Sequence, residues 1–144
     1  MTLLDRRRFV VAAAAIVGIA PATAQTPSTF TYRGFRVDIS AAQGLPNLKA
    51  IEDSLKHQID IVADCGVKAD ILAFFRSQDV LVKPGQGDGG GHFASGSRGV
   101  TIDAAVDAPE KPVLLHELLH AYHFRVLAGA LQNPDVLRFY DNAI

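Results

Sequence analysis

The first 24 residues of this 144-residue chain set the size of the unit that can fold. Three arginines at positions 6–8 precede an apolar run over residues 9–20, and small residues at 22–24 follow that run. A cationic segment, a short apolar run and a small-residue cleavage site are typical of a bacterial export signal. We expect this signal to be removed, which leaves residues 25–144 as a single domain outside the cytoplasm, periplasmic or secreted.

The export route stays open between two alternatives. Arg7 and Arg8, followed by Phe9, resemble a twin-arginine signal, although Asp5 stands where that motif has Ser or Thr. An ordinary secretory signal that is rich in arginine explains the same residues. The run over residues 9–20 rises about 18 Å as a helix, against roughly 30 Å of hydrocarbon, so we expect no stable membrane anchor.

The composition predicts a packed globular domain, because 49% of the residues are hydrophobic and 20% are charged. Cys65 is the only cysteine and has no partner for an intrachain disulfide, so the fold depends on an apolar core or on a metal. The formal net charge of −1 argues against nucleic acid as a partner. The sequence does not indicate an oligomeric state.

The hydrophobic periodicity predicts a mixed α+β fold. Alternating apolar residues predict strands, and apolar residues at three- and four-residue steps predict helices. The expected strands are 29–39 (a hairpin or a kinked strand), 79–83 and 100–103; the expected helices are 48–65, 69–76, 113–129 and one that starts at Asn133-Pro134. Cys65 falls on the apolar stripe of the first helix, so we expect a buried thiol.

Seven glycines between residues 85 and 99 predict a mobile loop or the tip of a hairpin. The segment lacks the spacing of a phosphate-binding loop. We expect His92, in the middle of this segment, to face solvent or substrate instead of a metal.

The sharpest signal is His116-Glu117-Leu118-Leu119-His120. Side chains four residues apart lie on the same face of a helix, so His116 and His120 can converge on one zinc ion. Glu117 lies about 100° around the helix from His116, where it can reach a metal-bound water and act as general base. A hydrolytic zinc site needs ligands that hold the metal, which activates water, and a carboxylate that accepts the proton of that water. The three residues can fill these roles.

The remaining parts of this helix and site are less defined. We expect the core-facing stripe of the helix to consist of Leu115, Leu118, Leu119, Tyr122 and Val126. His123 lies about 10 Å along the axis from His116, so it is a pocket residue or a surface residue and not the third zinc ligand. Asp141 is a candidate for that third ligand, and a ligand beyond Ile144 is the alternative.

The segment Leu114 to His123, with the strand at residues 99–102 and the loop at 91–93 before it, resembles the zincin-type metallopeptidases related to the catalytic domain of anthrax lethal factor. The resemblance covers residues 79–144, and only the His-Glu-Leu-Leu-His core is highly specific. It implies a small mixed sheet whose edge strand, residues 100–103, binds the substrate beside the active-site helix.

The same resemblance implies zinc on His116 and His120, with Glu117 as the general base. In that family the third ligand is a glutamate on a later helix, but no glutamate follows Glu117 in this chain. We therefore expect residues 25–144 to be a truncated zincin-like domain, or one whose site is incomplete.

The sequence thus predicts an exported zinc metallopeptidase with a peptide or protein substrate. The alternative is a degenerate zincin that binds metal or peptide without catalysis. A structural zinc site is disfavoured, because such sites use four ligands, usually including cysteines.

Overall fold

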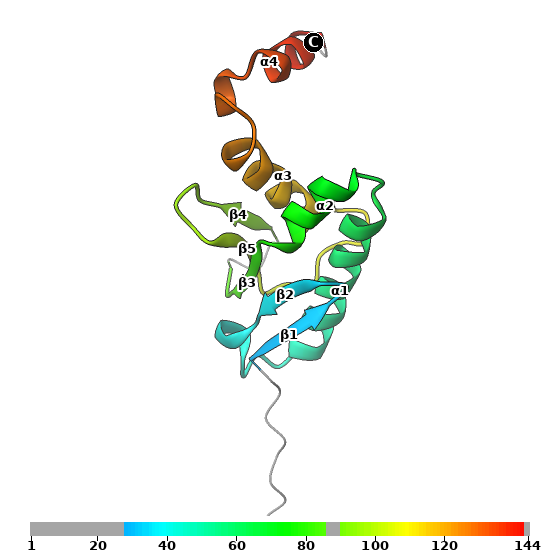
Figure 1. Cartoon of the computed structure of the whole chain (residues 1–144). Helices are drawn as coiled ribbons and strands as arrows, with labels where there is room; N and C mark the ends of the chain where they lie inside the picture. The colour runs from blue at the N-terminus through cyan, green and yellow to red at the C-terminus, as the bar shows by residue number, and fades with distance from the viewer. Residues whose placement is uncertain (1–27, 86–89, 143–144) are drawn as a thin grey trace, which may run out of the picture.

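The computed structural model describes residues 28–142 except 86–89, so the export signal expected over residues 1–24 lies outside the part described (Figure 1). This part is mixed α+β. Its elements are β1 (Thr29–Tyr32), β2 (Phe35–Asp38), the 3₁₀ turn η1 (Ser40–Ala42), α1 (Leu48–Asp64), α2 (Ala69–Arg76), β3 (Asp79–Lys83), β4 (Gly91–Phe93), β5 (Gly99–Asp103), α3 (Val113–Arg125), the 3₁₀ turn η2 (Ala130–Gln132) and α4 (Pro134–Asp141).

The five strands form one mixed sheet in the order β1-β2-β3-β5-β4. β1 and β2 are the expected hairpin, whose turn places Arg33 and Gly34 at positive φ angles of 46° and 86°. β2, β3 and β5 run parallel, and β4 pairs antiparallel with β5. A central set of parallel strands with antiparallel strands at both edges is common in sheets that helices cover.

The expectation that residues 100–103 form the edge strand is wrong. β5 lies between β3 and β4, and the edge strand on that side of the sheet is β4. The glycine-rich segment provides that strand by folding back onto β5, with Gly91 opposite Ile102 and Phe93 opposite Val100. Of the two expectations for this segment, a mobile loop or a hairpin tip, residues 91–103 form the hairpin.

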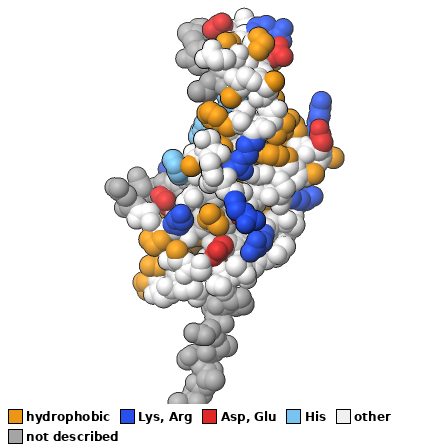
Figure 2. All heavy atoms as spheres, turned by 60° about the vertical axis from the view of Figure 1, so that its left-hand side comes forward, with side chains coloured by type: hydrophobic (Ala, Val, Ile, Leu, Met, Phe, Trp, Pro, Cys, Tyr) orange, Lys and Arg blue, Asp and Glu red, His pale blue; other side chains and the backbone are white. Residues whose placement is uncertain are grey.

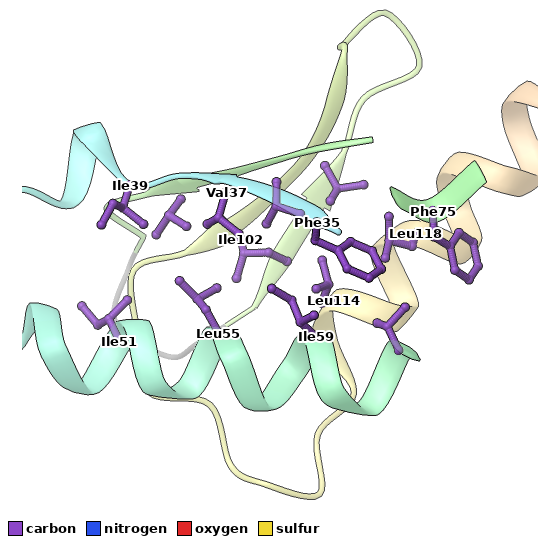
Figure 3. Close-up of a cluster of buried hydrophobic side chains, with 14 of the residues drawn as sticks. Phe35, Val37, Ile39, Ile51, Leu55, Ile59, Phe75, Ile102, Leu114 and Leu118 are labelled. Atoms are coloured by element: carbon purple, nitrogen blue, oxygen red, sulfur yellow. The ribbon is translucent and has the colours of Figure 1, made fainter. Parts of the chain in front are cut away.

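Alternate side chains of the central strands point to one face of the sheet, where the core lies. β2, β3 and β5 contribute fully or almost fully buried residues to that face: Phe35, Val37, Val80, Val82, Val100 and Ile102. Helix α1 covers them with Ile51, Leu55, Ile59 and Val62 (Figure 3). Helix α3 packs beside α1 over the same face, as Leu114 and Leu118 show.

The expectation that Cys65 is a buried core thiol is wrong. Helix α1 ends at Asp64, and Cys65 is the exposed residue that follows it. Its thiol donates a hydrogen bond to the carbonyl of Val62, at 3.0 Å. The apolar stripe of the helix thus stops one turn before Cys65, because the chain turns away there at Gly66, whose φ is 77°.

Helix α4 lies beyond the end of α3 and away from the sheet (Figure 1). It starts as predicted, because the side chain of Asn133 accepts hydrogen bonds from the backbone N–H groups of Asp135 and Val136, at 3.0 and 3.2 Å. In the described residues, no helix is both long enough and apolar enough to cross a membrane.

Candidate metal centre

Helix α3 places the residues of the predicted site on the boundary between core and solvent. It buries Leu114, Leu118 and Ala121 completely against the sheet and α1. The expected core stripe is wrong for Leu119 and Val126, which are 48% and 47% exposed. Because both faces of this helix bear apolar residues, periodicity alone could not fix its rotation. The observed rotation turns the histidines outward.

The two histidines of the motif converge. The Nε2 atoms of His116 and His120 lie 3.0 Å apart, and their rings meet edge to face with centroids 4.5 Å apart. Two nitrogens bound to one tetrahedral zinc ion, each at about 2.1 Å, lie about 3.4 Å from one another. The two imidazoles therefore have nearly the spacing that a shared zinc ion requires.

Glu117 lies beside this pair and is only 6% exposed. Gly91 of β4 covers it so closely that a Cβ atom at position 91 would fall 2.5 Å from its Cγ and 3.1 Å from its Oε1. The glycine is therefore a packing requirement of the site. Nothing in the sequence indicated that Gly91 lies against Glu117, because the contact depends on a strand pairing that no local pattern reveals.

A cleft runs along α3 with β4 as its wall. Its larger part, of about 360 Å³, is lined by Gly91, His92, Phe93, His116, Glu117, His120 and Phe124. A second part, of about 270 Å³, lies toward the start of α3 and shares Gly91, His116 and Glu117 with the first. Figure 2 shows histidine side chains at the surface on this side of the molecule. Glu117 and the two histidines thus open into the same space.

His92 lies on β4 and is exposed. It pairs with Thr101 in the neighbouring strand, so alternation places its side chain on the sheet face opposite to Gly91 and Phe93. The position of His92 on β4 borders the cleft, but its exposed side chain points away from α3 and toward solvent.

His123 does not join the pair. Its Nε2–H donates a hydrogen bond to the carbonyl oxygen of Ala130, at 2.8 Å, so the ring is attached to η2. Asp141 is an exposed residue at the end of α4. Within residues 28–85 and 90–142, no three His, Cys, Asp or Glu side chains are grouped so that they could hold a metal ion. His116 and His120 fit a zinc ion, but the described residues do not provide a third ligand.

Helix α1 holds the start of α3 in place. The buried side chain of Gln58 donates to the carbonyl of Lys111 at 2.7 Å and accepts from the N–H of Leu114 at 3.2 Å. This role of Gln58 was not predicted from the sequence. The signal was a polar residue at position 58, next to Ile59 on the apolar side of a helix, where a buried amide needs partners.

Two further contacts fix the segment before α3. The hydroxyl oxygen of Ser54 accepts a hydrogen bond from the N–H of Asp107 at 3.0 Å, and His57 Nε2–H donates to the carbonyl of Pro109 at 3.2 Å. The side chain of Asp107 is buried, and its Oδ1 has no hydrogen-bond partner among the described residues. Burial raises the pKa of the Asp107 carboxyl above its usual value, and nearby Lys111 opposes that rise.

The end of the cleft toward the C-terminus of α3 is aromatic. The rings of Phe93 and Phe124, which we call the aromatic wall, are stacked with centroids 5.7 Å apart and planes 28° from parallel. The guanidinium carbon of Arg125 lies 5.0 Å from the centre of the Phe93 ring. Arg125 also donates to the side chain of Gln78 and to the carbonyl of Ser97, so it ties α3 to the β4–β5 hairpin.

Comparison of the chain with protein-family models, with curated proteins and with solved structures finds no match.

Proposed function

We propose that this protein is an exported zinc-dependent metallopeptidase of the zincin type, similar to the catalytic domain of anthrax lethal factor. The observation that supports the proposal is the convergence of His116 Nε2 and His120 Nε2 to 3.0 Å in a cleft that Glu117 also lines. In this proposal the two imidazoles hold zinc, and a peptide or protein is the substrate.

The chemistry is divided among a few groups. Zinc, when bound, supplies a Lewis acid that acidifies water and polarises a carbonyl. The carboxylate of Glu117 accepts the proton of the attacking water and passes it to the leaving amine. Its position beneath Gly91 suits this work, because a side chain that packing holds in one place reorganises little during a reaction.

In this proposal the substrate-binding edge strand is β4, a role that the family resemblance had implied for residues 100–103. It is one of the two edge strands of the sheet and lies against α3 through Gly91 and Phe93. An edge strand presents backbone N–H and C=O groups on its outer side, and an extended peptide can pair with them. A peptide bound in this way would pass over Glu117 and the two histidines.

The test is Glu117→Gln in the full chain. We expect cleavage of an unbiased peptide library, in the presence of zinc, to fall by about 10²- to 10⁴-fold, which is the usual contribution of a general base. Zinc content measured by elemental analysis should stay the same, because Glu117 is not a ligand in the proposal. Glu110→Gln is the matched control, since Glu110 is exposed in the loop before α3.

Two results would contradict the proposal. Equal loss of zinc and activity in Glu117→Gln would make Glu117 a metal ligand. A zinc-loaded wild-type protein that cleaves no member of the library would leave the second candidate function, a degenerate zincin that binds metal or peptide without catalysis. The observation that favours this second candidate is that the described residues provide only two ligands.

A further inference from the structure

The aromatic wall shares a cleft with the motif residues. Phe93 and Phe124 line the same space of about 360 Å³ as His116, Glu117 and His120. Small-ligand sites commonly have volumes of this order, with apolar walls and a few polar groups. A ligand that reaches Glu117 and the histidines therefore has an apolar surface within the same cleft.

The wall is held in place before any ligand arrives. The ring of Phe93 is half-buried and contacts both the ring of Phe124 and the guanidinium of Arg125. Arg125 is itself fixed by its hydrogen bonds to Gln78 and Ser97. Binding to a surface that is already ordered avoids the entropy cost of immobilising side chains.

Phe124 is the more exposed residue of the aromatic wall. It is 39% exposed, whereas Phe93 and Arg125 are half-buried. The ring of His123 also lies beside Phe124, with centroids 5.4 Å apart, and the apolar area of Phe124 that stays exposed is what a further ring can cover. The near-parallel arrangement of Phe93 and Phe124 is the kind of stacking that another aromatic ring can extend.

We infer that the aromatic wall is the subsite for an aromatic side chain of the peptide, Phe, Tyr or Trp, bound against Phe124 next to His120. This inference rests on the proposed function, which supplies the ligand: a peptide that lies along β4. Stacking adds to the burial of apolar area, so an aromatic side chain should bind about 2- to 10-fold more tightly than a saturated ring of similar size.

The first experiment measures binding without catalysis. The full chain is titrated with N-acetyl-phenylalanine amide and with N-acetyl-cyclohexylalanine amide, and NMR shifts of His120 and Phe124 are followed. We expect the phenylalanine compound to bind about 2- to 10-fold more tightly. Equal affinity of the two compounds, or shifts confined to other residues, would overturn the inference.

Two variants distinguish the contribution of the aromatic ring of Phe124 from that of its apolar volume. Phe124→Leu keeps an apolar side chain and should remove the preference for the aromatic compound, whereas Phe124→Ala should weaken both compounds. Phe139→Leu is the matched control, because Phe139 is a 68% exposed phenylalanine on α4, outside the cleft. If Phe124→Leu keeps the full aromatic preference, the wall is not the subsite.

The second experiment distinguishes this inference from the proposed function. Products of the zinc-loaded wild-type protein on the peptide library are sequenced, and we expect aromatic residues to be enriched at one position and that enrichment to vanish in Phe124→Leu. Cleavage without aromatic enrichment would overturn the subsite and leave the peptidase. Aromatic binding in the titration without any cleavage would overturn the peptidase and leave the subsite.

Discussion

Gly91 on β4 lies directly against Glu117 on α3, so that a Cβ atom at position 91 would fall 2.5 Å from the Cγ atom of Glu117. The contact joins an edge strand to the central residue of the His-Glu-Leu-Leu-His motif. It packs β4 against the Glu117 side chain, and it requires glycine at one position of the strand.

Gly91→Ala should therefore disturb the site. Overpacking of a filled space costs about 1–3 kcal/mol of unfolding free energy, and either Glu117 or β4 must move. We expect the variant to unfold at a lower temperature and to lose peptide cleavage while keeping zinc. Gly96→Ala is the control, because a Cβ atom there would meet nothing within 4 Å. Equal stability of the two variants would show that the contact is not tight.

His120→Ala should remove zinc from the protein. The variant loses one of the two imidazoles that would bind zinc. Loss of a residue that only hydrogen-bonds to a metal ligand lowers metal affinity by roughly 10- to 100-fold, so loss of a ligand should lower zinc affinity by at least that much. Equilibrium dialysis followed by elemental analysis measures it. His57→Ala is the control, since His57 is an exposed histidine of α1 that contacts Pro109. Unchanged zinc content in His120→Ala would remove the proposed metal site.

Gln58→Leu should destabilise the fold more than its exposed counterpart Gln43→Leu. The change leaves two backbone groups without their partners, the carbonyl of Lys111 and the N–H of Leu114. Each unsatisfied buried group costs about 1–3 kcal/mol. Urea unfolding gives the difference. A loss in Gln58→Leu no larger than that in Gln43→Leu would mean that water replaces the amide.

Asp107→Asn should stabilise the protein at neutral pH. Burial raises the pKa of this carboxyl, so the folded state holds the proton more strongly than the unfolded state does. The favourable contribution of wild-type Asp107 is complete below the unfolded pKa of about 3.9 and is lost as the pH rises through the folded pKa. The advantage of asparagine should therefore be largest at pH 7 and shrink toward pH 4.

The measurement is urea unfolding of both proteins between pH 4 and pH 8. Asp53→Asn provides a comparison of opposite sign, because a hydrogen bond from Lys49 lowers the pKa of Asp53. That favourable contribution is present above the unfolded pKa and is lost as the pH falls. A stability gap between wild type and Asp107→Asn that does not change with pH would contradict the assignment to burial.

Local patterns predicted most elements of the fold. The spans 69–76 and 79–83 agree with α2 and β3, and Asn133 caps α4 as expected. These features depend on a helix period, a strand period and a cap, which neighbouring residues determine. The pair of histidines follows from the same helix geometry.

The features that were missed depend on residues far apart in the chain. The edge position of β4 depends on which strand pairs with β5, and the rotation of α3 depends on where the sheet and α1 lie. The spacing of apolar residues within one segment, such as 113–125, does not determine either feature. The same holds for the aromatic wall, because Phe93 and Phe124 come from two elements.

The hydrogen bonds from α1 to the start of α3 and to the segment before it reach main-chain atoms, at Asp107, Pro109, Lys111 and Leu114. The side chains from residue 108 to residue 112 are exposed. Lys111 and Pro112 also line the part of the cleft toward the start of α3, whereas Ala108, Pro109 and Glu110 line neither part. Dyes or affinity tags attached at these three positions would therefore stay clear of the histidine pair.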